Sequence, residues 1–450
     1  MGGELTAHFD TATNNYVLTL THYRDTIGIP LSSSASLYIW SYDPVNSSWS
    51  AFQNVNAPLD TALSTSLIPN FPYGVEVGVY RDTITLPAGQ YRILNTTCCR
   101  NGAIVNLAQP LSENMVLYTD LTVGNNNSTP GFLAMPVTYF PVNQPATYNP
   151  LPFDPDGDSL AWALNIPIGY GGSTSAMALD TVAGFTTPPG DPSGPFTMNS
   201  MTGEITWTPD TIGNYVQSFE VNEYHNGVQV GKIIRDMQYI VIPGGSNVSP
   251  YFQNVSPYLT NAGAGYNYIY YQPGNQLVFE IKGADVNPNT QLEMEAYSST
   301  FAMVNPATFT TQQSGNDIIG TFSWTPPAGF TQDVITVFRV RDGQFSNDFT
   351  LMMKLGSTSV TEVNTSVKDC QVFPNPSQGK LNVALELNRD SQTEIQLLNI
   401  HGQKVASVYE GKLMRGSNLL SADLTLSSGL YYLTVSQDGA VVKTITVAIQ

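Results

Sequence analysis

The sequence predicts an all-β protein made of tandem β-sandwich domains, and three observations support this fold class. Short stretches of alternating apolar and polar residues recur along the chain, bounded by Pro, Gly, Asn and Asp, as expected for strands that bury one face. The 37 Gly and 30 Pro residues, together with an aromatic fraction of 11%, favour strands and turns over helices. The 450 residues are enough for about three to four domains with cores of their own.

The charge balance argues against several classes of partner. The 17 basic and 35 acidic residues give a formal net charge of −18, which repels nucleic-acid phosphates and anionic membrane surfaces. Apolar runs have the length of strands and stay below the ~18 residues of a membrane-spanning helix. We therefore expect no nucleic-acid partner and no transmembrane segment. The strand pattern begins almost directly after Met1, as expected if an export signal had been removed and a start Met supplied.

The first predicted unit is a β-domain over residues 1–123. It contains alternating stretches such as NYVLTLTHY, ASLYIW and GVEVGVY, each followed by turn-forming residues. The polar run GNNNSTPG at 124–131 then marks a break in the pattern, so we place a domain boundary there.

The next two predicted units are copies of one domain, over residues 130–243 and 246–356. Each contains the spacing G-x-x-x-W-T-P, with Trp207 in the first copy and Trp324 in the second, 117 residues apart (324 − 207). A repeat of that length has the size of an immunoglobulin-like sandwich. Each Trp sits in an apolar and polar alternation, so we expect its indole in the core; the alternative is a surface Trp that stacks on carbohydrate.

The last predicted unit covers residues 371–450 and follows a linker at 357–370. The linker begins STSVTEVNTSVKD, which lacks the rhythm of strands and turns and is typical of a tether. The stretches KLNVALEL, TEIQLLNI, QKVASVY, LTLSSGLYYLTV and AVVKTITVAI then alternate in the manner of strands, with Gly turns between them. About 80 residues suffice for a small sandwich of its own.

This last unit resembles the type A C-terminal sorting domain of proteins exported by the type IX secretion system of Bacteroidota bacteria. The resemblance implies that the secretion machinery is a partner and that the protein reaches the outer-membrane surface or the medium through the periplasm. In that family the domain is commonly cut off in or just before its linker. The alternative is a terminal β-domain without a sorting role. The residues that carry the resemblance are Phe373, Pro374, Asn375, Pro376, Gly379, Gly402, Gly429 and Lys443.

The N-terminal unit resembles a domain at the start of large Bacteroidota surface proteins linked to gliding motility and adhesion. The stretches VLTLTHYRD, ITLPAGQY and CCRN carry this resemblance. The two middle units are similar to cadherin-like or immunoglobulin-like repeats, which are common spacers in bacterial surface proteins.

The sequence contains three cysteines, and their state is open. The family of the N-terminal unit often carries a Cys where Thr26 stands, so that disulfide position is absent. Adjacent Cys98 and Cys99 either form a vicinal bridge or stay as buried free thiols, and we expect free thiols because free Cys is usually buried. Nothing in the sequence fixes the state of Cys370.

The stretch FDPDGDSL is the candidate metal site. Asp154, Asp156 and Asp158 occupy alternate positions around Gly157, and hard oxygen ligands at this spacing suit Ca²⁺. The downstream Glu of an EF-hand loop is absent, so other ligands have to come from elsewhere in the fold. The alternative is that these Asp residues only form turns by accepting hydrogen bonds from backbone N–H groups.

The second repeat has a weaker version of this loop. Its stretch GADVNPNTQL keeps Asp285 but has Asn287 and Asn289 in place of the other two carboxylates. We expect weak cation binding there or none.

Nothing in the sequence indicates catalysis. The four His residues lie far apart, and there is no H-E-x-x-H motif, G-x-S-x-G motif or phosphate-binding loop. A hydrolase with carboxylates brought together only by the fold stays open as an alternative, because such pairs leave no local signature. We expect a protein that is not an enzyme.

Seven positions resemble the O-glycosylation acceptor of Bacteroidota, an Asp followed by Thr or Ser and then an aliphatic or small apolar residue. All lie before residue 212, outside the sorting unit. The alternative is that Asp-Thr pairs simply mark the ends of strands. The acceptor positions are Thr11, Thr26, Thr61, Thr83, Ser159, Thr181 and Thr211.

Together these observations predict an exported, non-enzymatic cell-surface or secreted protein with an adhesion or structural role. The alternatives are a carbohydrate-binding accessory protein, a self-assembling extracellular filament subunit and a secreted hydrolase. A surface glycan or a protein is the expected kind of ligand. The sequence leaves open the ligand's identity, the oligomeric state, the cleavage site, and whether the protein stays attached to the surface.

Overall fold

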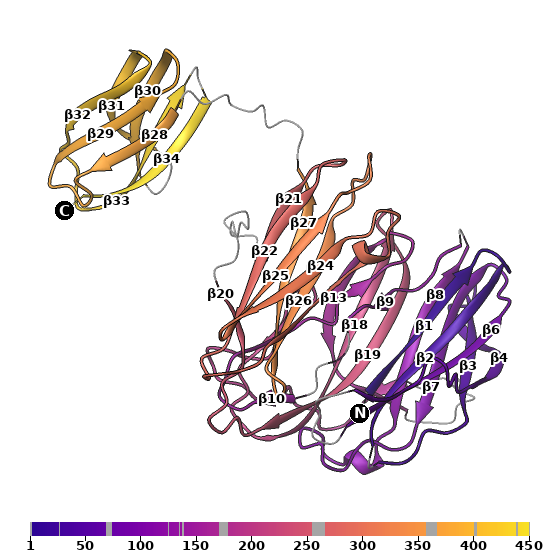
Figure 1. Ribbon diagram of the computed structural model, residues 1–450. Coiled ribbons are helices and arrows are strands. Elements are labelled where there is room, and N and C mark those ends of the chain that lie inside the picture. The colour runs from indigo at the N-terminus through magenta and orange to yellow at the C-terminus, as the bar shows by residue number, and fades with distance from the viewer. Residues whose placement is uncertain are drawn as a thin grey trace. The chain divides into compact units, whose positions relative to one another are not determined.

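The computed structural model is almost entirely β-structure (Figure 1). The described residues are 2–26, 28–68, 74–124, 126–134, 136, 139–170, 179–253, 266–356, 367–399, 403–437 and 440–449. They contain no α-helix, only strands and the short 3-10 helices Pro110–Ser112 and Ser299–Ala302, which confirms the predicted fold class. The chain forms two compact units, residues 1–356 and 357–450.

The N-terminal domain is formed by strands β1 to β8. Its strands form two groups, ordered β4-β3-β7-β8 and β1-β2-β6-β5. Alternation explains its core, since Tyr16, Leu18 and Leu20 of β2 are buried and the residues between them are not. The strands are β1 (Gly2–Asp10), β2 (Asn15–Asp25), β3 (Ser34–Asp43), β4 (Ser48–Pro58), β5 (Thr65–Ile68), β6 (Val75–Ile84), β7 (Gly89–Thr97) and β8 (Met115–Val123).

The middle domain extends from β9 to β19. Trp207 is buried in its core against Phe140, Phe196 and Tyr239, and its Nε1 donates to the carbonyl of Pro189 at 2.9 Å. The core position expected for this Trp is therefore correct. The strands are β9 (Gly131–Phe132), β10 (Tyr139–Pro141), β11 (Ala146–Tyr148), β12 (Pro152–Phe153), β13 (Ser159–Asn165), β14 (Ile168–Tyr170), β15 (Leu179–Thr181), β16 (Thr197–Met198), β17 (Ile205–Trp207), β18 (Gly213–His225) and β19 (Val228–Ile242).

Strand β19 joins the N-terminal and middle domains in one continuous sheet (Figure 1). One edge of β19 pairs with β18 along its length, and the other edge pairs in succession with β8, β1 and β10. Paired residues on this second edge include Lys232 with Asp120, Asp236 with Gly3, and Val241 with Phe140. The boundary predicted at residue 123 therefore does not coincide with a break in the sheet.

Two buried ion pairs reinforce this connection. Arg100 donates from both terminal nitrogens to the two carboxylate oxygens of Asp236 on β19, each at 2.9 Å. The neighbouring Arg235 donates to the hydroxyl of Tyr23 at 2.9 Å and lies 3.3 Å from the carboxylate of Glu4, which also accepts from Tyr23 at 2.7 Å. Burial keeps such pairs from water, so removing one partner typically costs about 3–5 kcal/mol.

The third domain is a sandwich of two four-stranded sheets, ordered β20-β22-β25-β24 and β21-β27-β26-β23. Trp324 is buried between them against Tyr271 and Phe330, again as expected from the repeat. The strands are β20 (Tyr251–Gln253), β21 (Asn267–Tyr271), β22 (Leu277–Ala284), β23 (Glu293–Ser298), β24 (Thr308–Ser314), β25 (Asp317–Trp324), β26 (Val334–Arg341) and β27 (Ser346–Leu355).

The middle and third domains share a buried polar contact. Arg339 on β26 pairs with both oxygens of Asp348 on β27 at 2.7 Å, and both side chains are buried. Asp348 also accepts from the backbone N–H of Asn149 at 2.8 Å, and its carbonyl accepts from the hydroxyl of Thr147. One face of the β21-β27-β26-β23 sheet packs into the core of the third domain. The opposite face of this sheet lies against the middle domain.

The second compact unit contains the described strands of the predicted sorting domain. They form two sheets, ordered β28-β29-β32 and β31-β30-β33-β34, around a core that includes Leu381, Leu397, Leu433 and Val447. Cys370 is a buried free thiol in this core. The strands are β28 (Val367–Phe373), β29 (Lys380–Leu387), β30 (Ser391–Leu398), β31 (Lys404–Leu413), β32 (Gly416–Asp423), β33 (Gly429–Gln437) and β34 (Ala440–Ile449).

Candidate cation site and sorting motif

Three acidic side chains of the middle domain converge on one point. Asp154, Asp158 and Glu223 each place a carboxylate oxygen within 4.8 Å of the others. The first two belong to the loop between β12 and β13, and Glu223 lies on β18, where it pairs with Leu160 of β13. The fold therefore brings together a loop and a strand that are more than sixty residues apart in sequence.

The loop is shaped by one carboxylate oxygen. Oδ1 of Asp154 accepts hydrogen bonds from the backbone N–H groups of Asp156 and Asp158, both at 2.9 Å. Gly157 between them has a φ of +86°, a conformation that other residues rarely adopt. The turn-forming alternative from the sequence is thus present, and it leaves Oδ2 of Asp154 facing the cluster without a partner among the described residues.

Asp156 does not join the cluster. Its Oδ2 instead accepts from the backbone N–H of Ser128 at 2.6 Å and so holds the segment that connects the N-terminal and middle domains. Of the three expected metal ligands, the structure groups Asp154 and Asp158 and adds Glu223, which the sequence did not single out. Alternation on β18 buries Phe219, Val221 and Glu223 in turn, so a charged residue at an inward position was the available signal.

The cluster is short of hydrogen-bond donors. Glu223 is fully buried, and neither of its carboxylate oxygens has a hydrogen-bond partner of normal distance and angle among the described residues, although the side-chain amide of Asn127 lies close enough to lower its pKa. Oδ2 of Asp158 likewise has no partner among these residues. Opposite it, Gly231 on β19 makes the space, because a Cβ there would lie 1.9 Å from Oε2 of Glu223. Oδ1 of Asp158 contacts Nδ1 of His225 at 2.7 Å.

Burial and neighbouring charges shift the pKa values of two of these carboxylates. Burial raises the pKa of Glu223 to about 9, and the nearby carboxylate of Asp154 adds to the rise. Burial also raises the pKa of Asp154 to about 6, although the N–H groups of Asp158 and Asp156 oppose it. Crowded, buried carboxylates with fewer donors than acceptor oxygens are costly unless a proton or a cation neutralises them. The residues present therefore fit a hard divalent cation, which takes oxygen ligands.

The corresponding place in the third domain lacks a third converging carboxylate among the described residues, although Oδ2 of its buried Asp285 also has no hydrogen-bond partner there. Asp285 accepts from the backbone N–H of Asn287 at 2.6 Å. Asp342, directly after β26, accepts from Nδ2 of Asn247 at 2.9 Å and from two backbone N–H groups. No group of three acidic side chains forms there among the described residues.

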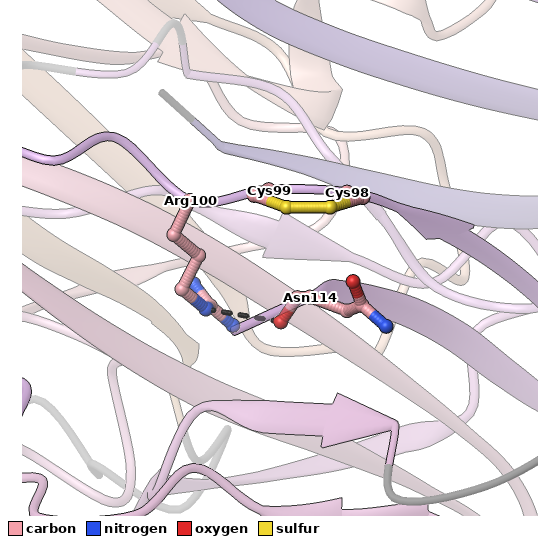
Figure 2. Close-up of a disulfide and its surroundings, with 4 residues drawn as sticks. All are labelled: Cys98, Cys99, Arg100 and Asn114. Carbon is pink, nitrogen blue, oxygen red and sulfur yellow. Dashed lines mark hydrogen bonds between the residues drawn. A yellow bond between two sulfur atoms is a disulfide. The ribbon is translucent and has the colours of Figure 1, made fainter. Parts of the chain in front are cut away.

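Cys98 and Cys99 differ from the expectation of buried free thiols. Figure 2 shows them joined in a vicinal disulfide, and both residues are exposed. The next residue, Arg100, is buried and donates from Nε to the carbonyl of Asn114 at 3.2 Å (Figure 2). The bridge therefore lies directly beside the arginine that pairs with Asp236.

The glycosylation candidates lie mostly at the surface. Thr26 is half-buried, whereas the other six side chains are exposed. Several take part in the local hydrogen bonding typical of strand ends; for example, the hydroxyl of Thr211 donates to Asp210 at 2.8 Å. Exposure is compatible with modification, which stays a prediction. The exposed candidates are Thr11, Thr61, Thr83, Ser159, Thr181 and Thr211.

The Pro-Asn-Pro motif lies along the last strand of the chain. The side-chain amide of Asn375 donates to the carbonyl of Thr446 at 2.8 Å and accepts from the N–H of Ala448 at 2.9 Å. Ser377 continues the contact by donating its N–H to the carbonyl of Ala448 at 2.8 Å. The peptide bonds before Pro374 and Pro376 are cis.

The other sorting-motif residues are spread over the domain. Phe373 ends β28 with an exposed side chain, and Gly379 turns the chain into β29 with a φ of +95°. Gly429 begins β33, and the exposed Lys443 lies on β34 opposite Val435. Gly402 lies outside the described residues.

The sorting domain is confirmed by comparison with known families. Residues 371–449 match the family described as "Secretion system C-terminal sorting domain", which corresponds to the predicted unit. The chain thus carries the sorting domain of type IX secretion and is exported to the cell surface or secreted. No helix among the described residues is long and apolar enough to cross a membrane.

Two solved structures align weakly with this chain. The I-band fragment I67–I69 of titin has a TM-score of 0.18 at 13% identity and covers 71% of this chain and 98% of its own. SGBP-B from the Bacteroides ovatus mixed-linkage glucan utilization locus, solved with a mixed-linkage heptasaccharide, has a TM-score of 0.17 at 15% identity, with coverages of 72% and 71%. No curated protein matches the chain.

Proposed function

We propose that this exported protein acts outside the cell as a non-enzymatic adhesion or structural component. The observation that carries the proposal is the pairing of a sorting domain with a separate, larger unit of residues 1–356. A sorting domain directs transport, so we assign the function of the protein after export to the larger unit.

The construction of the larger unit supports a mechanical or display role. The N-terminal and middle domains are tied by a shared sheet and by the buried pair Arg100–Asp236. The third domain contacts the middle domain through Asp348, which accepts from the backbone N–H of Asn149, so the domains are not connected by linkers alone. Conformational freedom between domains is the default when an interface is small and polar. A unit with buried charges at its junctions presents its surfaces in a fixed arrangement, which suits attachment.

We also propose that the middle domain binds Ca²⁺ through Asp154, Asp158 and Glu223. Bound there, the ion supplies positive charge to three carboxylates that otherwise lie close together in a buried place. The loop at Asp154 and the strand at Glu223 are then held by a common ligand. The protein oxygens number fewer than the 6–8 that Ca²⁺ takes, so further oxygens complete its coordination.

Deleting residues 371–450 tests the export part of this proposal. In a host with type IX secretion, we expect the truncated protein to stay in the periplasm, while the full chain reaches the surface or the medium. Location is measured by fractionation and immunoblotting, with an export-deficient strain as the control. Normal secretion of the truncated protein would contradict the assignment.

A surface test addresses the adhesion part. Cells that lack the protein are compared with cells that carry the full chain for attachment to glass, to polysaccharide films and to each other. We expect attachment to fall when the protein is absent and to return with the full chain. Unchanged attachment on every surface, together with turnover of a polysaccharide or peptide by the purified protein, would point to the hydrolase alternative.

A further inference from the structure

A cavity of about 400 Å³ lies between the middle and third domains. The middle domain contributes the Asp154–Leu160 loop region and Trp162, and the third domain contributes Gln332, Ile335 and Met352. Both domains belong to the same compact unit, residues 1–356. The cavity has the volume of a small-molecule site rather than of a packing defect.

One wall of the cavity is a sheet face that continues beyond it. Ile335 on β26 pairs with Met352 on β27, and Met352 pairs with Tyr268 on β21, so these three side chains lie in one row on the same face. Residues that point to the other face of the same strands, such as Ile269 and Phe338, lie in the core of the third domain. The row therefore runs from the cavity to the edge strand of the sheet.

Along that edge strand lies a shelf of tyrosines, Tyr266, Tyr268 and Tyr270. Alternation places them on one face, and their ring centroids are 6.1 and 5.4 Å apart in sequence order. Tyr270 is 55% exposed, and the other two are half-buried. Lys354 lies 6.0 Å from the ring of Tyr266 and pairs at 2.6 Å with Asp333, which also lines the cavity.

Polar side chains line the cavity beside its apolar wall. Ser159 and Ser299 supply hydroxyl groups, and Gln332 supplies an amide. These groups both donate and accept hydrogen bonds. A ligand that carries both donors and acceptors therefore suits the cavity.

We propose that the cavity and the tyrosine shelf together bind a neutral oligosaccharide, an inference that rests on the proposed adhesion role and names its ligand. Sugars present apolar C–H faces that pack on tyrosine rings and hydroxyls that both donate and accept. The shelf supplies the rings, and the cavity supplies the hydroxyl groups of Ser159 and Ser299 and the amide of Gln332.

Charge selects against acidic glycans. The carboxylates that line the cavity belong to Asp154, Asp158 and Asp333, and the nearby Lys354 is already paired with Asp333. An anionic sugar would meet this negative charge without a free cation of the protein to offset it among the residues lining the cavity. A neutral sugar meets acceptors that its hydroxyls can use.

The position of the cation site adds a second element to recognition. Asp154 and Asp158 border the cavity and also belong to the carboxylate cluster with Glu223. A Ca²⁺ ion bound by this cluster offsets part of the negative charge beside the cavity. The uronic-acid oligomer should therefore be rejected more strongly with a chelator than with Ca²⁺.

The test uses the full chain and three hexasaccharide probes, a β-linked glucose oligomer, a mannose oligomer and a uronic-acid oligomer, with a neutral hexapeptide as a fourth probe. Calorimetry and tryptophan fluorescence measure binding with Ca²⁺ and with a chelator. We expect a neutral sugar to bind, the uronic-acid oligomer to bind at least tenfold more weakly, and the fluorescence to change because Trp162 lines the cavity.

Substitutions locate the site. Tyr270→Ala and Gln332→Ala should each weaken binding of the neutral sugar about tenfold, whereas the matched control Tyr432→Ala, an exposed tyrosine of the sorting domain, should leave it unchanged. No binding of either neutral sugar, or equal binding by Tyr270→Ala and the native chain, overturns the proposal. Binding of the hexapeptide alone overturns it in favour of a protein partner. Either result rejects the oligosaccharide as ligand without affecting the secretion and attachment tests. Failure of this inference can therefore be distinguished from failure of the proposed function.

Discussion

Glu223 is the central residue of the proposed cation site in the middle domain. It is fully buried on β18 beside two other carboxylates, and Gly231 leaves it room. A buried acid of this kind usually has an arginine or several N–H donors. The other buried acids at the domain junctions follow that rule, for example Asp236 with Arg100 and Asp348 with Arg339.

Replacing Glu223 tests the cation site. We expect Glu223→Gln to abolish the rise in melting temperature that Ca²⁺ gives the native protein, a rise worth about 2.7 kcal/mol at a concentration 100 times the dissociation constant. Without Ca²⁺ the variant should be at least as stable as the native protein at pH 7.5, because the raised pKa of Glu223 means that the native protein has to take up a proton on folding, whereas glutamine is neutral in both states. Scanning calorimetry of the full chain with Ca²⁺ and with a chelator measures both effects.

Two other acids serve as controls for this experiment. Asp156→Asn should keep most of the Ca²⁺ response, because Asp156 bonds to the N–H of Ser128 and lies outside the cluster. Asp285→Asn in the third domain should keep all of it. If the melting temperature of the native protein is the same with Ca²⁺ and with a chelator, the proposed cation site is wrong.

His22 makes the N-terminal domain sensitive to acid. Its Nε2 lies 3.2 Å from Oδ1 of Asn95, and burial lowers the pKa of His22 from 6.5 to about 4. The unfolded chain therefore binds a proton between these values that the folded chain does not. Stability should be complete above pH 6.5 and fall as the pH drops towards 4, by roughly 2 kcal/mol for this partly buried group.

The contribution of His22 is measured by comparison with His22→Gln, whose amide can still donate to Asn95. Urea midpoints of both proteins are recorded from pH 7 to pH 4. We expect the midpoint of the native protein to fall more steeply than that of the variant below pH 6.5. Parallel curves would show that His22 does not titrate in this way.

At this scale the sequence predicted part of the site. Asp154 and Asp158 could be proposed because their spacing is local, and oxygen ligands two residues apart are a recognisable pattern. Glu223 could not, because its neighbours in the cluster come from the loop before β13, and only the pairing of β13 with β18 brings them together. Free thiols were wrongly expected at Cys98 and Cys99, since the usual burial of Cys does not hold for this exposed pair.

Among the elements, β34 is distinguished by how its outer edge is covered. It is the last strand of its sheet, and Asn375 and Ser377 bond to its backbone near Thr446 and Ala448. An amide side chain can replace a neighbouring strand here because it both donates and accepts. The sorting motif therefore has a structural task as well, which is to fasten the end of the chain.

Asn375→Ala should weaken this fastening. Two hydrogen bonds are lost, so we expect the sorting domain to lose about 1–2 kcal/mol of stability and its last residues to exchange amide hydrogens faster. Asn375→Asp should be intermediate or close to Ala, because a carboxylate accepts from Ala448 but cannot donate to Thr446. Hydrogen exchange on the full chain measures the effect.

The exposed Gln371 on β28 provides the matched control, and Gln371→Ala should leave exchange in β34 unchanged. If Asn375→Ala and Gln371→Ala behave alike, the amide of Asn375 has no structural role. If secretion fails while exchange is normal, the motif is read by the machinery directly.

Individual strands were predictable from the sequence, but their partners were not. The alternation in NYVLTLTHY corresponds to the buried pattern of β2, and both repeat tryptophans lie in cores. Alternation reports which side of a strand is buried and says nothing about the neighbouring strand. The pairing of β19 with β8, β1 and β10 joins segments far apart in sequence, so no local sequence pattern predicts this pairing.

For the whole molecule, the contact of β19 with the N-terminal domain makes residues 1–123 dependent on the middle domain. Without β19, the edges of β1 and β8 lose their partner, and the buried Glu4 and Arg100 lose Arg235 and Asp236. Exposed edges and unpaired buried charges both favour aggregation or unfolding.

A truncated chain of residues 1–123 should therefore fail to fold, whereas a chain of residues 1–356 should unfold cooperatively. Circular dichroism with heating and light scattering compare the two. A cooperative transition in the short chain would show that the N-terminal domain is autonomous, as its sequence alone suggested. Aggregation of both chains would instead reveal a need for the sorting domain.

The reach of β19 also sets an order on folding. Gly2 pairs with Met237, so the sheet that contains β1 cannot close until β19 has been made. Contacts over such separations form slowly, because a long loop has to close before the contacts stabilise the chain. A protein whose strands pair over such distances stays open for longer during its synthesis, which leaves more time for export before it folds.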